Sequence, residues 1–475
     1  MTIAVRNPRT GAYDAAIVPP SDAALAEIAG GLRAAQPAWA ALGLEGRAGA
    51  LMELHAAITR HADAIAAALE IDTGRRAIAR QELKGVLSSL AAWAGQAGQL
   101  LPDGWTQGRS MPHLKHRPQF APYALVGVIS PWNFPLTLAM IDTIPALLAG
   151  CSVLLKPSEA TPRFVAPLME AASQAPAIAS VFEAVLGGPD TGRGVIAAAD
   201  ALCFTGSVAT GRAVAAQAAA RMIPAFLELG GKDPLIVLPS ADLDAAVTAA
   251  LRGSVLATGQ ACQSIERIYV ARPLFDAFVE RLAAAAAACR LNWPDIQAGD
   301  IGPIIFEKQA LILQAHLDDA YAKGARVLTG GVLETHGGGL WLRPTVLTNV
   351  DHGMKVMTEE TFGPIMPVMA FDTVDEAVAL ANDTLFGLSA AVMAGSLDEA
   401  EAVGRRLQAG AVSLNDAALT SLFYEAEKHA FGLSGLGGSR MGAAGFQRFL
   451  RRKALIANMG GPAPLSAFAE DGVMD

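Results

Sequence analysis

The chain has 475 residues, of which 52% are hydrophobic, and a formal charge of −9 at pH 7. The apolar content excludes a disordered protein, and the length suffices for two domains. The excess of acidic residues argues against nucleic acid as a partner, since binding to phosphate requires a basic surface. Four scattered cysteines and an amino terminus unlike a signal peptide favour free thiols and a cytoplasmic location.

The first hundred residues are predicted to be helical. Ser21 and Asp22 are suited to cap a helix over residues 23–32, and two Ala-rich segments, 46–69 and 80–100, carry apolar residues at helical spacing. A stretch rich in Pro, Gly and charge, 101–117, then breaks the pattern.

Residues 118–141 contain no charged side chain and are numerous enough to cross a membrane. Four prolines would break such a helix. We therefore interpret the stretch as a buried strand over 124–130, a turn and the start of a helix, and we expect no membrane partner.

Short apolar runs then alternate with helical segments, which predicts an α/β fold with a parallel sheet covered by helices. Ligands of such sheets lie beyond the carboxyl ends of the strands. Lys156, Gly206, Ser207 and Glu228 all fall at or just after such ends. The predicted strands are 125–130, 152–156, 182–186, 201–205, 226–229 and 235–238.

A second series of strands and helices predicts a second α/β domain that faces the first. Its helices include 273–288 and 397–406. Its predicted strands are 268–270, 326–328, 345–347, 365–370, 389–392 and 412–414.

Cys262 lies in the segment GQACQSIER, where Gly259 and Gln260 suggest a tight turn. A cysteine at a turn can present a thiolate beside a backbone N–H, as covalent catalysis requires. The alternative is a buried structural thiol, and this alternative suits the other three cysteines, which lie in or beside predicted strands and at a helix end.

Two polar residues are further candidates. Glu228 ends an apolar strand before Gly230 and Gly231, as a general base would, although pairing with Lys232 is an equal alternative. Asn133, within SPWNFP, is either a structural bridge or a donor aimed at a reacting oxygen.

The segment FTGSVATG (204–211) is a strand that leads through a Gly-rich turn into a helix. It lacks the features of a P-loop and of the usual dinucleotide fingerprint. Backbone N–H groups at the helix start remain suited to a pyrophosphate.

Together these features resemble the aldehyde dehydrogenase superfamily over nearly the whole chain. The matching segments occur in the family's order: SPWNFP (130–135), LLKPSEATP (154–162), FTGSVATG (204–211), LELGGKDP (227–234), GQAC (259–262) with Arg267, EETFGPI (359–365) and SGLGGSRMG (434–442).

The resemblance implies oxidation of an aldehyde to a carboxylic acid, with Cys262 as the nucleophile that forms a thiohemiacetal and then a thioester. The amide of Asn133 and the backbone N–H of Cys262 would hold the oxyanion, and Glu228 would activate the hydrolytic water. The apolar residues Phe134, Met140, Ile141 and 422–424 are suited to an entrance for an aromatic or medium-chain aliphatic aldehyde, the alternative being that these side chains only pack in the core.

The resemblance also implies NAD as the cofactor, with NADP possible, and no metal. Lys156 and Glu360 would bind ribose hydroxyls, Phe362 would support the nicotinamide ribose, and Ser207 would contact the pyrophosphate. Glu159 occupies a position where an acidic side chain repels a 2′-phosphate. The other implied cofactor contacts are Trp132, Ser158, Gly206, Leu229 and Gly230.

The family fold implies two Rossmann-type α/β domains and a small bridging element that joins subunits into a homodimer or homotetramer. We assign residues 1–100 and 124–234 to the cofactor-binding domain and 235–453 to the catalytic domain. Residues 101–123 and 454–475 would form the bridging element and a tail.

Some positions depart from the family pattern. Asp142 occurs where many hydrolytic members carry Lys, and Ala257 where many carry Asn. None of the departures removes a catalytic group. The alternatives are a CoA-acylating enzyme, which usually lacks the base at Glu228, a thiol esterase, and a non-catalytic relative.

Overall fold

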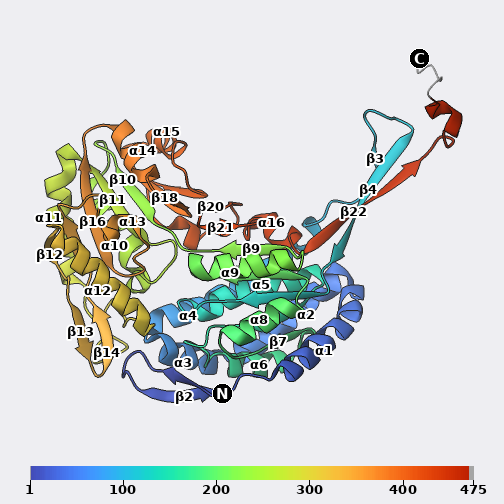
Figure 1. Cartoon of the computed structure of the whole chain (residues 1–475), viewed down its shortest axis with the longest axis horizontal. Helices are drawn as coiled ribbons and strands as arrows, with labels where there is room; N and C mark the ends of the chain where they lie inside the picture. Colours follow the sequence, from blue (N-terminus) through green and yellow to red (C-terminus); the bar gives the residue numbers. More distant parts are fainter. Residues whose placement is uncertain (1, 470–475) are drawn as a thin grey trace.

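The computed structural model describes residues 2–469. Its elements form two α/β lobes and a three-stranded ribbon that extends away from them (Figure 1). One lobe is built on a six-stranded sheet and the other on a seven-stranded sheet. The predicted α/β class, with mainly parallel sheets, is confirmed.

The sheet of the first lobe has the order β21-β9-β8-β5-β6-β7. All neighbouring pairs are parallel except β21 with β9. Its strands are β5 (Leu125–Ile129), β6 (Ser152–Lys156), β7 (Phe182–Ala184), β8 (Ala201–Thr205), β9 (Ala225–Glu228) and β21 (Gly435–Leu436).

Helices cover both faces of this sheet, because successive side chains of each buried strand point to opposite faces. In β6, Val153 and Leu155 pack on one face and Leu154 on the other. The first face is covered by α2 (Gly43–Arg60), α3 (Ala62–Thr73), α4 (Arg76–Gln96), α5 (Pro135–Ala149), α6 (Val165–Ser173) and α7 (Pro176–Ala179), and the second by α1 (Asp22–Ala41), α8 (Pro189–Ala198) and α9 (Val208–Ala220).

The second lobe has the strand order β12-β15-β16-β11-β10-β18-β19, parallel except where β12 meets β15. The strands are β10 (Asp233–Val237), β11 (Ile265–Ala271), β12 (Arg326–Thr329), β15 (Thr345–Thr348), β16 (Ile365–Phe371), β18 (Ser389–Met393) and β19 (Ala411–Leu414). One face packs against α10 (Leu243–Val255) and α11 (Arg272–Ala288), and the other against α12 (Glu307–Ala322), α13 (Lys355–Thr358), α14 (Val374–Asn382) and α15 (Leu397–Gly404).

The prediction of a helical first hundred residues is wrong at the amino terminus. The chain begins with a hairpin of β1 (Ile3–Arg6) and β2 (Tyr13–Ile17), whose loop is fixed by long-range bonds such as the one from Arg9 to the Asn292 carbonyl oxygen (2.8 Å). The predicted segment 46–69 is helical and is divided between α2 and α3, because the backbone leaves the helical conformation at His61.

Two further short pairings complete the second half of the chain. β13 (Leu333–His336) pairs with β14 (Gly339–Leu342), and β17 (Phe386–Gly387) pairs with β20 (Phe431–Gly432). The chain then returns to the first lobe, where β21 joins β9 and α16 (Gly442–Gln447) packs against α5. The assigned range 235–453 therefore includes a segment that belongs spatially to the first sheet.

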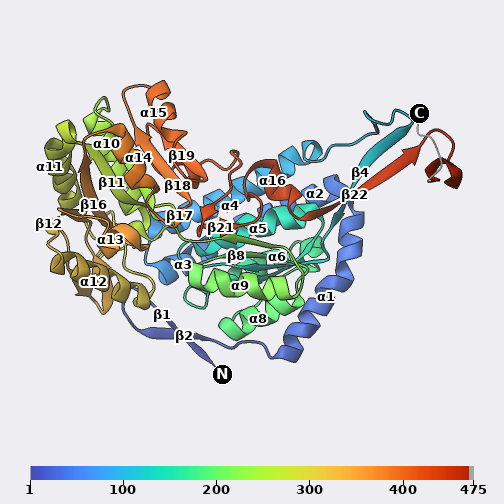
Figure 2. The same ribbon diagram turned by 45° about the horizontal axis from the view of Figure 1, so that its top comes forward.

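The ribbon consists of β3 (Thr106–Gln107), β4 (Leu114–Pro122) and β22 (Leu450–Asn458). Figure 2 shows it projecting from the first lobe. The C-terminal strand starts at Leu450 and not at 454 as predicted, because it pairs along all of β4. A short turn of helix, Leu465–Phe468, follows, and residues 470–475 of the predicted tail lie outside the described residues. Among residues 2–469, no helix has the length and apolar character needed to cross a bilayer.

Candidate active site

Cys262 and Glu228 come from facing parts of the two lobes. Glu228 is the last residue of β9, as predicted, and Cys262 precedes β11 in the loop that follows a short helical turn, Leu256–Gly259. Cys262 is partly exposed, whereas Cys151 and Cys203 are buried. Gly231, three residues after Glu228, lies so close to the cysteine loop that a Cβ there would be 2.8 Å from the Cys262 carbonyl oxygen, so the two candidate residues belong to one site.

The backbone before Cys262 is unusual. Ala257, Thr258 and Gly259 all have positive φ values, of 56°, 62° and 66°. At Gly259 the tight turn also demands the absence of a side chain, since a Cβ would lie 2.4 Å from the carbonyl group of Gly363. The predicted turn is therefore present, and it packs against the loop that carries Glu360.

Buried hydrogen bonds hold this turn in place. Gln260, which is fully buried, donates to the Pro303 carbonyl oxygen (3.0 Å) and accepts from Ile305 N (2.9 Å). Arg75 comes from the first lobe and donates to the carbonyl oxygens of Ala257 (3.0 Å) and Asn133. The guanidinium of Arg75 thus ties the turn before Cys262 to the segment that carries Asn133.

The amide of Asn133 is buried and lies next to the cysteine loop. Its Nδ2 donates to the carbonyl oxygen of Gln260, two residues before Cys262, over 3.0 Å. The nitrogen has a second N–H. Asn133 is therefore a structural bridge to the cysteine loop, and it retains one donor for a ligand.

Burial raises the pKa of the Cys262 thiol to about 12, and the carboxylates of Glu228, Glu360 and Asp233 raise it further. Lys428 acts in the opposite direction and lowers it. The free thiol therefore needs a positive charge or a proton acceptor to react near neutral pH.

Glu228 does not pair with Lys232, which was the alternative to a role as a base. Lys232 is fully buried and its Nζ donates to Glu266 Oε2 over 2.9 Å. The cation near Glu228 is Lys428, whose Nζ lies 3.7 Å from Glu228 Oε2.

The Gly-Gly turn after β9 allows three segments to meet. A Cβ at Gly230 would lie 2.3 to 2.4 Å from the carboxylate atoms of Glu360, and one at Gly231 would lie 2.8 Å from the carbonyl oxygen of Cys262. Gly231 N donates to Glu360 Oε1 (3.3 Å). Burial raises the pKa of Glu360 to about 8.

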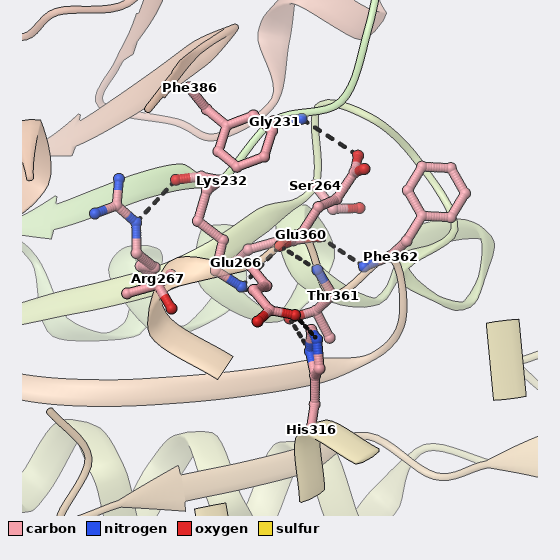
Figure 3. Close-up of polar contacts among 12 residues, drawn as sticks. Gly231, Lys232, Ser264, Glu266, Arg267, His316, Glu360, Thr361, Phe362 and Phe386 are labelled. Carbon is pink, nitrogen blue, oxygen red and sulfur yellow. Dashed lines mark hydrogen bonds and ion pairs between the residues drawn. The ribbon is translucent and has the colours of Figure 1, made fainter. Parts of the chain in front are cut away.

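A buried carboxylate fixes the loop that contains Glu360 (Figure 3). Glu266 accepts hydrogen bonds from the backbone N–H groups of Thr361 (2.8 Å) and Phe362 (2.7 Å). Lys232 joins the same network, since its Nζ also donates to Thr361 Oγ1 over 2.8 Å. Phe362 has a left-handed backbone with φ of 53°, so these bonds hold a conformation that is costly for a side-chain-bearing residue.

The remaining predicted cofactor residues line the ends of the first sheet. Lys156 is buried at the end of β6, with Nζ 3.3 Å from Glu159 Oε2. Ser207 caps α9, a helix of 13 residues. The indole of Trp132 meets the Phe362 ring edge-on, with centroids 5.4 Å apart.

The other predicted positions have local roles. Ser158 Oγ accepts from Ala160 N (3.2 Å), and Leu229 N donates to the Ser434 carbonyl oxygen (2.8 Å). Gly206 packs against the Phe204 ring.

Asp142, where many family members carry Lys, has its own pair of counter-charges. Its carboxylate is buried and accepts hydrogen bonds from Arg440 (2.7 Å) and Arg448. The arginines lower the pKa of Asp142 against the effect of burial. The substituted residue is thus ionised and neutralised within the fold.

Sequence reasoning did not assign Arg75, Glu266 or Lys428 to the site. The nearest signal is the charged pair Glu266-Arg267 in an otherwise apolar strand, β11. Arg267 anchors this strand, since its guanidinium donates to the carbonyl oxygens of Lys232 (2.8 Å) and Ala381 (2.8 Å). Nothing in the local sequence distinguishes Arg75 or Lys428 from solvated basic residues.

Comparison with known proteins gives a consistent result. A family model described as "Aldehyde dehydrogenase family" matches residues 1–455. A Mycolicibacterium smegmatis protein named "Putative succinate-semialdehyde dehydrogenase (NADP(+))" is 38% identical over 386 residues, covering 81% of this chain and 75% of that protein. A Streptomyces coelicolor protein, "3,6-anhydro-alpha-L-galactose dehydrogenase", is 35% identical and covers 95% of this chain and 92% of its own length.

Solved structures agree in fold over almost the full length. The "Putative Aldehyde Dehydrogenase PutA" of Anabaena variabilis has a TM-score of 0.96 and 55% identity, covering 98% of this chain and 99% of that one. A betaine aldehyde dehydrogenase from Staphylococcus aureus in complex with NAD+ has a TM-score of 0.90 and 28% identity, covering 98% and 92%. The chain belongs to the aldehyde dehydrogenase family and is an NAD(P)-dependent oxidoreductase.

Proposed function

We propose that this enzyme oxidises an aldehyde to its carboxylic acid through a thiohemiacetal and a thioester on Cys262. The observation that carries the proposal is the meeting, between two lobes, of a partly exposed thiol, a carboxylate at a strand end and a buried amide with one unused N–H. These are a nucleophile, a base and an oxyanion donor.

In the first step the Cys262 thiol loses its proton to solvent water, its sulfur attacks the carbonyl carbon, and the carbonyl oxygen becomes an oxyanion. Asn133 Nδ2 supplies one donor, and its bond to the Gln260 carbonyl oxygen keeps that donor close to the nucleophile. The backbone N–H of Cys262 is the second proposed donor. Donors fixed before the reaction stabilise the developing charge without reorganisation.

NAD(P)+, when bound, would supply the hydride acceptor. The chain's own residues fit such a cofactor, since Gly230, which has no side chain, lets the backbone lie directly beside the Glu360 carboxylate, and a helix N-terminus capped by Ser207 is available to an anionic group. Glu360 and Lys156 would hold ribose hydroxyls, and Phe362 would support the nicotinamide ribose.

In the last step Glu228 takes a proton from water, which attacks the thioester carbon and releases the acid and the Cys262 thiol. The position of Glu228 at the end of β9 supports this role. Pairing of Lys232 with Glu266 and not with Glu228 leaves the Glu228 carboxylate available as a base.

The proposal is tested with Glu228→Gln and Cys262→Ser. With NAD+ and benzaldehyde or hexanal, Glu228→Gln should give a burst of NADH followed by turnover reduced at least about 100-fold, because acylation persists while deacylation fails. Cys262→Ser should show no burst. A Glu228→Gln enzyme with unchanged steady-state rate would contradict the proposed water activation.

Two alternative activities share the acyl-enzyme. A CoA-acylating enzyme would be accelerated by free CoA, and the presence of Glu228 argues against it. A thiol esterase would cleave p-nitrophenyl acetate without nucleotide, and we expect this only as a side activity that disappears in Cys262→Ser.

For the substrate we propose an aromatic or medium-chain aliphatic aldehyde. Leu422, Phe423 and Tyr424 are 46 to 54% exposed, and the neighbouring Thr420 donates to Gln263 Oε1 (2.5 Å), directly after Cys262. Met140, by contrast, is fully buried in the core and does not line an entrance. The name of the M. smegmatis relative makes succinic semialdehyde the second candidate, so it belongs in the same substrate panel.

We also propose a homodimer or homotetramer joined through the ribbon, and a location in the cytoplasm. The exposed apolar side chains of Leu455 (37%) and Ile456 (69%) on β22 support the former. The four free cysteines support a reducing compartment.

A further inference from the structure

Lys428 is a buried cation that none of the assigned roles explains. Its side chain is 3% exposed, and its Nζ has no hydrogen-bond partner among the described residues. A buried ammonium without acceptors is costly, and such groups in native proteins call for a functional explanation. The group with opposite charge nearest to Nζ is the carboxylate of Glu228, 3.7 Å away.

The backbone around Lys428 is held firmly. Its N–H donates to Ser439 Oγ over 3.1 Å, and the carbonyl of the next residue, His429, lies so close to Gly410 that a Cβ there would be 1.9 Å away. A few residues later, β21 pairs with β9 at Glu228 itself. These contacts anchor the Lys428 backbone close to the strand that carries Glu228.

The charged groups that influence this region come from several elements. The charge of Lys428 lowers the pKa of Asp233, on β10, and the pKa of Cys262. The Glu360 carboxylate raises the pKa of Cys262. Arg440 lies within reach of Glu228 but is committed to Asp142 and Thr205 through bonds of 2.7 Å each.

The chain neighbours of Lys428 are directed elsewhere. Glu427 accepts from Ala444 N (2.8 Å), and His429 Nδ1 lies 3.2 Å from the Gly437 carbonyl oxygen. Lys428 is thus the cation that faces the Glu228 carboxylate, whereas Lys232 lowers the pKa of Glu360.

We propose that Lys428 is a positioning residue for the proposed reaction, whose ammonium orients the Glu228 carboxylate, 3.7 Å away, and offsets the negative charges around Cys262. The inference rests on the proposed role of Glu228 as the base that activates water. Lys428 does not exchange a proton in this scheme. It acts through charge at short range, where a nearby positive charge favours the ionised form of a thiol.

The test compares Lys428→Met, which removes the charge at similar length, with Lys428→Arg, which keeps it. Lys84→Met, at an exposed position of α4, is the matched control. The kcat for benzaldehyde or hexanal with NAD+ is measured from pH 6 to 10. Lys428→Met should move the acid limb of the profile upward by about one pH unit or more, whereas Lys428→Arg and Lys84→Met should follow the parent enzyme.

A second measurement concerns the thiol alone. The rate of Cys262 alkylation by iodoacetamide is measured against pH without nucleotide. In Lys428→Met the pH at which this rate increases should be higher than in the parent. A purely structural role would lower kcat equally at every pH and leave the alkylation profile in place. If Lys428→Met does not yield folded protein by circular dichroism, Lys428→Gln takes its place. If neither neutral variant folds, the proposal rests on Lys428→Arg, which must retain both parent profiles.

The proposal is overturned if the neutral variant and the parent have superimposable pH profiles, or if Lys428→Arg deviates as much as Lys428→Met. This result is distinct from failure of the proposed function. Normal turnover of Glu228→Gln would exclude Glu228 as the base. If Glu228→Gln gives the expected burst but the pH profile of Lys428→Met is unchanged, only the role of Lys428 is excluded.

Discussion

The turn before Cys262 contains three consecutive residues, 257–259, with left-handed backbone conformation. Two of them, Ala257 and Thr258, carry side chains. Each such residue costs roughly 1–2 kcal/mol. Two hydrogen bonds offset this strain. The Arg75 guanidinium donates to the Ala257 carbonyl oxygen, and the Thr258 hydroxyl donates to the Gly302 carbonyl oxygen (3.1 Å). The nucleophile is therefore presented by a turn that only the surrounding fold can maintain.

A single residue also affects the pH dependence of stability. Glu82 is buried, accepts from Leu136 N (3.1 Å) and Thr137 N (3.0 Å), and has a pKa raised by burial to about 7 from an ordinary value of 4.5. The folded state thus binds this proton more tightly than the unfolded state. The resulting stabilisation is full below about pH 4.5 and is lost as the pH rises through 7.

Glu82→Gln should remove this dependence, because an amide does not titrate. Between pH 5 and pH 8, thermal melting should show the parent losing on the order of 1–3 kcal/mol relative to the variant. Glu45→Gln, an exposed change on α2, is the control. Parallel melting curves for parent and Glu82→Gln at both pH values would contradict the prediction.

Glu159 affects cofactor choice at the residue scale. Its carboxylate lies 3.3 Å from Lys156 Nζ and is 39% exposed. A negative charge here opposes a 2′-phosphate, so we expect NAD to be preferred to NADP. Glu159→Gln should raise kcat/KM for NADP+ relative to NAD+ about tenfold, which is ~1.4 kcal/mol, while the exposed Glu170→Gln should leave the ratio unchanged. A ratio that does not move would assign the preference to other residues.

At the scale of elements, β11 joins the nucleophile loop to the cofactor loop. Cys262 precedes this strand, and Glu266 within it accepts the N–H groups of Thr361 and Phe362. A carboxylate offers two acceptor oxygens, whereas an amide directs an NH2 group at one of the two donors.

Glu266→Gln should therefore loosen the loop of Glu360 and Phe362. The KM for NAD+ should rise at least about fivefold, while cleavage of p-nitrophenyl acetate without nucleotide changes less than about twofold. Glu334→Gln, on the distant β13, is the control. Equal losses in both assays would indicate general destabilisation, for example by the unpaired Lys232, and not loosening of the loop.

At the scale of the whole molecule, the ribbon has one prominent property. It projects from the lobes (Figures 1 and 2). Apolar side chains of β22 are exposed. Burial of such surface is the main driving force of association. Ile456→Lys should convert the proposed dimer or tetramer into a smaller species in analytical ultracentrifugation, whereas Val18→Lys, exposed elsewhere, should not. An unchanged sedimentation coefficient for Ile456→Lys would place the interface elsewhere.

The sequence determined the fold class and the strands next to the site. Alternating apolar runs located β5, β6, β8 and β9, because burial on both faces leaves a signal in neighbouring residues. The Gly-rich turns were equally readable, since close approach of two backbones tolerates only glycine, as at Gly231 and Gly259.

The tertiary structure alone decided how charges pair. Lys232 was expected to compete for Glu228, yet it pairs with Glu266, and the cation beside Glu228 is Lys428 from a distant loop. Local pattern carries no information on such pairs, because they depend on which strand ends the fold brings together. The hairpin at the amino terminus was missed for the same reason, since its stability comes from contacts with residues near 292 and 338.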